Sequence, residues 1–197
     1  LLATFDKETV RVHKDEVVPH GALLYDPALF PAVAAIGRSD CLLIPIPYGD
    51  IIKATAKQFN REKEIMKLQI MKNVISVAAS LGLLGLDFSY LKETLEKIFT
   101  GRRAALAPMN VWAAEQAYQL TADPALQARY PYKLKSVPVP SDERRIMIGG
   151  TTATALGKIV GGCRFQTYYP ITPASDESEY LESHPEYGVV VVQSEDE

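Results

Sequence analysis

The sequence predicts an α/β protein built from two three-layer α/β units. Short apolar runs bounded by turn residues, typical of buried strands, alternate with segments of helical periodicity. A proline-rich stretch interrupts this alternation once, and the chain's 197 residues are enough for one or two domains. Near the end, Val189 to Val192 form a continuous β-branched run, as expected for a parallel strand covered on both faces.

In the first unit, apolar runs and helical spacing alternate from residue 21 to residue 120. The predicted elements are strands at 21–26 and 41–47 and helices at 49–59, 64–85, 88–99 and 110–120. The end of the second helix carries Ala78, Ala79, Ser80 and Gly82, and such small residues predict close packing against a neighbour. Asp87 is placed to cap the following helix.

Composition changes near Asp123, where four prolines fall within about twenty residues and indicate a linker. A second α/β pattern follows. Its predicted elements are strands at 145–150, 163–170 and 188–192 and helices at 151–162 and 172–182. We therefore divide the chain into a domain at 1–122, a linker at 123–143 and a second domain at 144–197, and we expect the first domain to lack its start and the second its end.

Composition also limits the possible partners. The net charge of -3 gives no basis for binding nucleic acid or an anionic membrane, and no apolar run approaches the ~20 residues of a membrane span. The first residues lack the features of a signal peptide, so we predict a cytoplasmic protein. Cys41 and Cys163 are far apart and read as buried thiols, and the three histidines show no ligand spacing. We expect no metal on this chain.

The stretch Y-P-I-T-P is the strongest local signal for a site. Pro170 and Pro173 fix the backbone around Thr172, which is predicted to cap a helix whose first turn contains Asp176 and Glu177. This pattern has a purely structural interpretation as a helix start. It also suits recognition of a small acid, because a hydroxyl donor would lie at a helix N-terminus beyond the carboxyl end of a strand. Both interpretations remain open from these residues alone.

Beyond that local reading, the segments "CRFQTYYPITPASDESEYLE" and "GVVVVQSEDE" resemble the pyrimidine-type, thiamine-binding domain of 2-oxoacid:ferredoxin oxidoreductases. The segments "VVPHGALLYDP", "CLLIPIPYGDIIK" and "KNVISVAASLGLLGLDFSYLKETLEKIF" resemble the gamma domain of the same enzymes, which is a Rossmann-like fold. Their order matches the family's fused gamma–alpha subunit, of which this chain would be a fragment. One departure is Gly150-Thr151-Thr152, where family members commonly carry Gly-Asn-Glu or Gly-Asn-Asp.

The resemblance implies thiamine diphosphate chemistry. Such enzymes convert a 2-oxoacid and coenzyme A to acyl-CoA and CO2 and pass electrons to ferredoxin through iron–sulfur clusters. Glu195 matches the glutamate that shares a proton with the aminopyrimidine ring. Arg164 has two interpretations: a cation that binds the substrate carboxylate, or a member of a surface ion pair. The residues assigned are Thr172 and Glu195 for catalysis and Tyr169, Pro170, Ile171, Thr172, Pro173 and Arg164 for substrate binding.

The resemblance also implies partners. The chain has too few cysteines for an iron–sulfur cluster, so a beta subunit is expected to carry the [4Fe-4S] cluster, Mg²⁺ and the diphosphate site. The cofactor would then be shared at an interface, in a heterodimer or a dimer of heterodimers. Two alternatives stay open, namely a non-catalytic assembly subunit and an α/β domain that binds a small acid.

Overall fold

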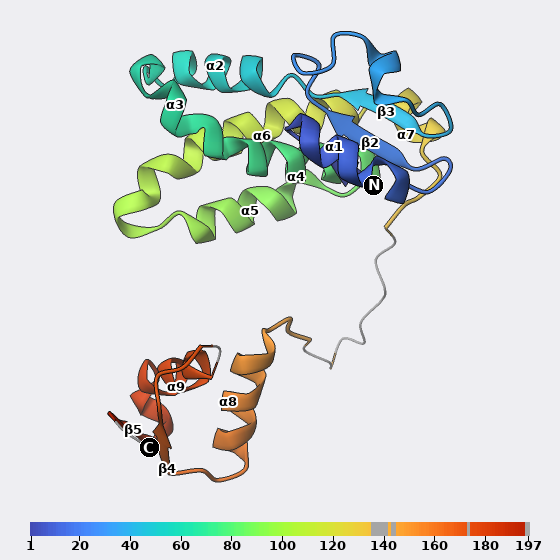
Figure 1. Ribbon diagram of the computed structural model, residues 1–197. Helices are drawn as coiled ribbons and strands as arrows, with labels where there is room; N and C mark the ends of the chain where they lie inside the picture. Colours follow the sequence, from blue (N-terminus) through green and yellow to red (C-terminus); the bar gives the residue numbers. More distant parts are fainter. Residues whose placement is uncertain (135–141, 143–144, 173, 196–197) are drawn as a thin grey trace. The chain divides into compact units, whose positions relative to one another are not determined.

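The computed structural model describes residues 1–134, 142, 145–172 and 174–195. These residues fall into two compact units, Leu1–Ser136 and Val137–Glu197 (Figure 1). The boundary lies inside the predicted linker, and each unit is described below by itself.

The first unit contains a three-stranded parallel sheet in the order β1-β2-β3. Its strands are β1 (Leu2–Ala3), β2 (Ala22–Tyr25) and β3 (Leu42–Pro45). Two of them confirm the strands predicted at 21–26 and 41–47. Strand β1 was not predicted; it extends the sheet because Leu2 pairs with Leu23, and the backbone N–H of Thr4 donates to Leu24 at 2.9 Å.

Helices account for most of the rest of this unit. They are α1 (Lys7–His13), α2 (Tyr48–Gln58), α3 (Ile65–Leu68), α4 (Lys72–Leu84), α5 (Phe88–Ile98), α6 (Ala107–Thr121) and α7 (Pro124–Arg129). Short 3-10 turns connect them: η1 (Lys14–Glu16), η2 (Val33–Ile36), η3 (Glu62–Glu64), η4 (Gln69–Met71) and η5 (Gly101–Leu106). The predicted helices at 49–59, 88–99 and 110–120 are confirmed as α2, α5 and α6, and Asp87 caps α5 by accepting from the N–H of Ser89.

Two predictions for this unit are wrong. The single helix at 64–85 is broken into α3, η4 and α4. Leu68 and Met71 are both buried three residues apart, a spacing that the three-residue turn of a 3-10 helix satisfies. The first part of the predicted linker forms α7, because Asp123 accepts from the N–H of Leu126 at 2.8 Å and Pro124 occupies the first helical position. The same proline that suggested a linker begins a helix.

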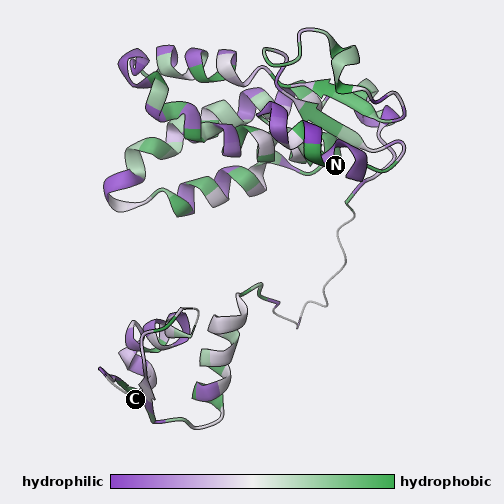
Figure 2. Cartoon of the chain, viewed as in Figure 1, coloured by the Kyte–Doolittle hydropathy of each residue, from purple (hydrophilic) through white to green (hydrophobic). Residues whose placement is uncertain are grey.

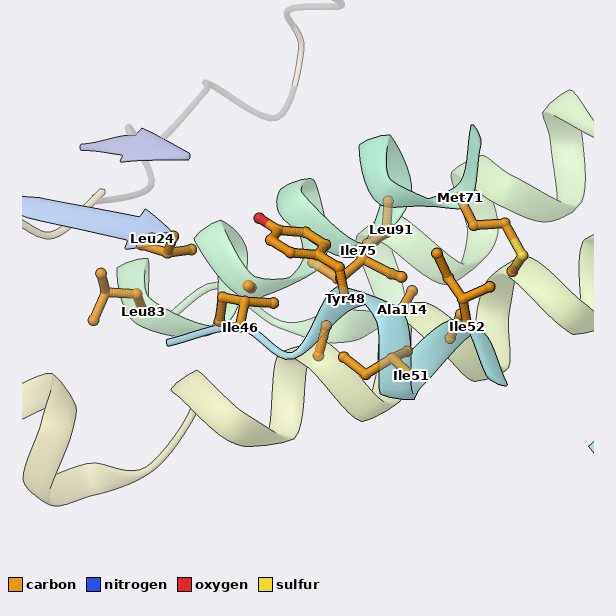
Figure 3. Close-up of a cluster of buried hydrophobic side chains, with 14 of the residues drawn as sticks. Leu24, Ile46, Tyr48, Ile51, Ile52, Met71, Ile75, Leu83, Leu91 and Ala114 are labelled. Carbon is orange, nitrogen blue, oxygen red and sulfur yellow. The ribbon is translucent and has the colours of Figure 1, made fainter. Parts of the chain in front are cut away.

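The sheet of the first unit is covered on both faces, which confirms a three-layer α/β arrangement there. Leu23 and Tyr25 pack with Val10 and Ile36 on one face. On the other face a larger cluster joins β2 and β3 to the helices; Figure 3 shows Leu24, Ile46, Tyr48, Ile52, Ile75 and Leu83 meeting in it. Strands β2 and β3 are hydrophobic along their length, whereas hydrophobic and hydrophilic residues alternate along the helices (Figure 2).

Helices α4 and α6 approach each other closely at the small residues of α4. A Cβ built on Gly82 would lie 2.4 Å from Oγ1 of Thr121 and 2.6 Å from the carbonyl oxygen of Tyr118. The Thr121 hydroxyl, in turn, donates to the carbonyl oxygen of Ala79 at 2.8 Å. The close packing predicted from the small residues is therefore confirmed, and Gly82 is the position that permits it.

The second unit is a smaller α/β unit with a two-stranded parallel sheet. Its elements are α8 (Gly150–Val160), β4 (Phe165–Tyr168), α9 (Ser175–Glu182), η6 (Pro185–Tyr187) and β5 (Val190–Gln193). Ala155, Leu181 and Val189 form its small core. The predicted helix at 151–162 and the predicted strands at 163–170 and 188–192 are confirmed within a few residues at each end.

Two expectations for the second unit are not met. Residues 145–149 form no strand, because the two described strands pair with each other and not with this segment, and Met147 is fully exposed. The valine run is not covered on both faces: Val190 and Val192 are 58% and 43% exposed, and the neighbouring Phe165 is 62% exposed. Only one face of this sheet packs on helices, so the described residues of the second unit make two layers.

Candidate functional site

The candidate site lies where two parallel strands of the second unit end side by side. In the register of β4 and β5, Tyr168 pairs with Gln193, the last residue of each strand. The backbone N–H of Ser194 donates to the carbonyl oxygen of Tyr168 at 2.8 Å and extends the pairing by one step. The loop that begins at Tyr169 and the acidic residue Glu195 therefore depart from the same edge of the sheet. The carboxyl ends of parallel strands are the usual place for ligands in α/β folds.

The loop after β4 is a tight turn stabilised by backbone hydrogen bonds. The N–H of Ile171 donates to the carbonyl oxygen of Tyr169 at 2.8 Å, and the N–H of Ser175 donates to that of Ile171 at 3.1 Å. Tyr169, Ile171 and Thr172 are all exposed, as is Pro170. These side chains are therefore exposed on a loop whose own backbone hydrogen bonds hold its shape.

Thr172 does not cap helix α9, which corrects the sequence prediction. The helix begins at Ser175, and its N-cap residue is Ala174, whose side chain cannot accept a hydrogen bond. Thr172 lies in the turn ahead of the helix, and the turn's own backbone bond from Ser175 to Ile171 shifts the helix start. Pro173 lies outside the described residues. The acidic residues Asp176 and Glu177 do lie in the first turn, as predicted.

Arg164 lies at the other end of β4. It precedes Phe165, the first residue of the strand, so about 13 Å of strand separates it from the loop. Its guanidinium donates to the carbonyl oxygen of Cys163 at 2.8 Å, and its own carbonyl accepts from the N–H of Val190. The structure brings Thr172 and Glu195 to one edge of the sheet but does not bring Arg164 to them.

Glu195 is exposed in this chain, two residues beyond the end of β5. The sequence had predicted a carboxyl at the end of a strand buried on both faces, but the outer face of β5 is open here. Glu195 offers a carboxylate that can share a proton with a ring nitrogen, and the Thr172 hydroxyl can donate a hydrogen bond. Among the described residues, no group of three or more His, Cys, Asp or Glu side chains could hold a metal ion.

Tyr168 ties the two strand ends to helix α9. Its hydroxyl lies 3.1 Å from Oε1 of Glu182 and 3.3 Å from Oε1 of Gln193. Desolvation raises the pKa of Tyr168, and the hydrogen bond to Glu182 raises it further. The phenol consequently stays protonated and serves as a donor near neutral pH.

A polar network that the sequence did not reveal links helix α8, strand β4 and helix α9. Lys158 of α8 forms an ion pair with Glu177 of α9 and donates to Oε1 of Gln166 at 2.8 Å. The amide of Gln166 donates to the hydroxyl of Ser178 at 2.6 Å. These residues come from three elements, and no spacing within one element could have indicated that they meet.

At the start of α8, the N-cap residue is Gly149, with no side-chain capping bond. Thr151 and Thr152, which stand where the family commonly carries Asn and an acid, lie within the first turn and do not cap the helix. Cys41 and Cys163 are free and half-buried, less buried than predicted, and burial raises the pKa of the Cys41 thiol. In the part of the chain that the structure describes, no helix has the length and apolar character needed to cross a membrane.

The fold and the site define an α/β protein with parallel sheets, in which an exposed loop follows one strand and an exposed carboxylate follows its neighbour at the same end of the sheet. The chain belongs to the pyruvate ferredoxin/flavodoxin oxidoreductase family, whose profile matches residues 1–120. That match covers the sheet and most helices of the first unit.

Curated relatives extend the similarity into the second unit. The chain is 34% identical to 2-oxoacid:ferredoxin oxidoreductase 1, subunit alpha, of Sulfurisphaera tokodaii over 186 residues, which cover 88% of this chain and 28% of the relative. It is 40% identical to the 2-oxoacid:ferredoxin oxidoreductase subunit alpha of Saccharolobus solfataricus over 168 residues, which cover 79% of this chain and 24% of the relative. The chain thus spans less than a third of the length of these relatives.

A solved structure is similar over almost the whole chain. It is the 2-oxoglutarate:ferredoxin oxidoreductase from Magnetococcus marinus with 2-oxoglutarate, coenzyme A and succinyl-CoA bound. The TM-score is 0.72 at 28% sequence identity, and the match covers 98% of this chain and 32% of that chain.

Proposed function

We propose that this chain forms part of the alpha subunit of a 2-oxoacid:ferredoxin oxidoreductase. Residues 1–122 would be its gamma-type domain and residues 144–197 the start of its pyrimidine-type domain, in the fused gamma–alpha order. The enzyme would convert a 2-oxoacid and coenzyme A to acyl-CoA and CO2 while ferredoxin accepts the two electrons. The similarity to alpha subunits on both sides of the linker supports this proposal.

The observation that carries the site assignment is the hydrogen bond between Ser194 and Tyr168. It holds the Y-P-I-T-P loop and Glu195 at one edge of the sheet. In our proposal Glu195 shares a proton with the aminopyrimidine ring of thiamine diphosphate, and the hydroxyl of Thr172 donates to the substrate or the reacting end of the cofactor. The bound cofactor would supply an electron sink for decarboxylation.

This function requires a second polypeptide. Glu195 and the outer face of β5 are exposed, and a carboxylate acts best as an acid–base group when water is excluded from it. We propose that a beta subunit covers this edge and contributes the diphosphate site, Mg²⁺ and the [4Fe-4S] cluster. Arg164 has no role in this arrangement, because it lies at the opposite end of β4.

The test is the substitution Glu195→Gln in the complete, cofactor-loaded complex. The amide keeps the size of the side chain but cannot take up or release a proton, so we expect 2-oxoacid-dependent reduction of ferredoxin to fall by at least ~100-fold. Glu186→Gln, at an exposed position in η6, is the matched control and should leave the rate unchanged.

Thr172→Val removes the hydroxyl at nearly constant size and should lower the rate of the same complex. An unchanged rate in Glu195→Gln, with normal assembly and bound cofactor, would contradict the catalytic role. That result would favour a non-catalytic assembly subunit.

A further inference from the structure

The first unit contains a pocket of about 470 Å³, and none of the residues that line it belongs to the candidate site described above. It lies between the broken helix α3–η4–α4 and the segment that joins α5 to α6. In Figure 1, α3 lies at the end of the helical layer away from β2 and β3. The residues that line it are Glu64, Lys67, Leu68, Ile70, Met71, Asn73, Val74, Phe99, Arg103, Leu106, Met109 and Asn110. Its volume falls within the range of about 300–1,000 Å³ typical of small-molecule sites.

The wall of this pocket is apolar. Leu68, Met71 and Met109 are buried, with 7%, 3% and 2% of their surface exposed. Val74, Phe99 and Leu106 also line it and are half-buried, whereas Ile70 is 74% exposed. Two methionines in one pocket favour an aliphatic occupant, because their flexible thioethers adapt to chains of different shape.

The rim of the pocket is positively charged. Lys67 and Arg103 both line it and are exposed, and neither forms an ion pair with a carboxylate of the described residues. Glu64 also lines it. Its carboxylate accepts from the guanidinium of Arg61 at 2.7 Å, and this hydrogen bond lowers the pKa of Glu64. The charge of Lys67 lowers that pKa further, so Glu64 offsets part of the rim's charge and leaves it net positive. Asn110 is 7% exposed and donates to the carbonyl oxygen of Leu106, so one N–H of its amide remains to donate.

A neighbouring pocket shows that this charge is specific to one side of α6. That pocket has a volume of about 310 Å³. Among the described helices, α6 is the one that contributes residues to both pockets. The neighbouring pocket is lined by two acidic residues, Glu96 and Glu115. An anion would be repelled there and attracted at Lys67 and Arg103. The two pockets therefore provide an internal contrast in charge.

We infer that the pocket of Lys67 and Arg103 binds an aliphatic carboxylate. The hydrocarbon chain lies among Leu68, Met71 and Met109, where apolar surface is removed from water. The carboxylate lies at the rim, between the ammonium and the guanidinium. No keto group is needed, so the ligand class is broader than that of a 2-oxoacid substrate. The inference is independent of the proposed function, because its residues belong wholly to the first unit.

Octanoate is the probe, and the four methionines of the chain are the reporters. In the complete chain, labelled with ¹³C at the methionine methyl groups, octanoate should shift the NMR signals of Met71 and Met109 saturably. Met147 lies in the second unit and is fully exposed, so its signal should stay in place. Octylamine has the same chain and the opposite charge, and it should bind at least several-fold more weakly.

Substitutions distinguish the contribution of the rim charges to octanoate affinity from that of the apolar wall. Lys67→Gln combined with Arg103→Gln should weaken octanoate binding by about tenfold, since exposed charge contacts each change affinity by a few-fold. The matched control combines Lys63→Gln with Arg102→Gln, which are exposed positions outside the pocket, and should bind as the unchanged chain does. Val74→Phe should fill the pocket and reduce binding while the signal of Met147 remains unchanged.

Three results would overturn the inference. Equal affinities for octanoate and octylamine would show that the positive charge of the rim does not contribute to binding. Equal octanoate affinities of the two double variants would show that Lys67 and Arg103 do not bind the carboxylate. Loss of octanoate binding when the chain is assembled with its partner polypeptides would show that the pocket is a protein interface.

Discussion

The backbone N–H of Ser194 and the carbonyl oxygen of Tyr168 lie 2.8 Å apart and close the end of the β4–β5 ladder. This hydrogen bond sets where the Y-P-I-T-P loop and Glu195 leave the sheet. Ser194→Pro removes the donor and should release Glu195 from the edge of the sheet, with a cost in stability of about 0.5–1.5 kcal/mol. We expect the ferredoxin-reducing activity of the complex to fall at least tenfold. Ser194→Ala keeps the backbone donor and should retain activity; equal rates would contradict the positioning role.

Gly82 should be intolerant of any side chain. A Cβ at this position would meet the hydroxyl of Thr121 and the carbonyl oxygen of Tyr118, so Gly82→Ala should force α4 and α6 apart and cost about 1–3 kcal/mol. Trp112, the only tryptophan of the chain, lies in α6 and reports the unfolding of this unit by fluorescence. Gly49→Ala in α2 meets nothing within 4 Å and should change the unfolding free energy little.

Asp6 caps helix α1 and makes its stability depend on pH. Its carboxylate accepts from the hydroxyl and the backbone N–H of Thr9 at 2.6 and 2.7 Å, and these bonds lower its pKa from the usual value of 3.8. The pKa of Asp6 is lower in the folded chain than in the unfolded chain. The cap therefore stabilises the fold fully at pH values above the unfolded-state pKa, and this stabilisation is lost as the pH falls through the folded-state pKa.

Asp6→Ala should therefore cost about 1 kcal/mol of unfolding free energy at pH 7 and progressively less as the pH falls below 3.8. Denaturant titrations at pH 7 and at a series of pH values below 3.8 measure this difference. Asp50→Ala, which removes an exposed carboxylate in α2 but no cap, is the control. A cost for Asp6→Ala that does not change with pH would show that the charge of the carboxylate is not what stabilises the helix.

Lys158 and Glu177 connect α8 to α9, and their side chains are 40% and 16% exposed. Lys158→Met leaves the less exposed carboxylate of Glu177 without its cation and should destabilise the second unit by about 1–2 kcal/mol. Breaking a fully buried ion pair would cost more, but Lys158 is partly solvated. Lys158→Met combined with Glu177→Leu should recover part of that loss. Amide hydrogen exchange in α8 and α9 measures it. If the loss of stability in the double variant equals the sum of the losses in the two single variants, the two side chains are not coupled.

Much of the fold followed from local patterns. The apolar runs of β2 and β3 and the valine run of β5 indicated strands, because their β-branched and aliphatic residues lie between turn signals. The prediction for helix 64–85 was wrong because apolar spacing cannot distinguish one helix from α3, η4 and α4 in succession. Strand β1 has only two residues, too few for any periodicity to show.

The sequence by itself determined which chemical groups are present: a threonine between two prolines, a carboxylate after a β-branched strand, and an alternation of strands and helices on both sides of a proline-rich stretch. Only the tertiary structure decided which of these groups meet. The parallel pairing of β4 with β5 brings the loop and Glu195 to one edge of the sheet and leaves Arg164 at the other. Likewise, Lys67 and Arg103 share a pocket although 35 residues separate them. Sequence patterns report local spacing along the backbone, whereas a site depends on strand register and helix packing, which long-range contacts set.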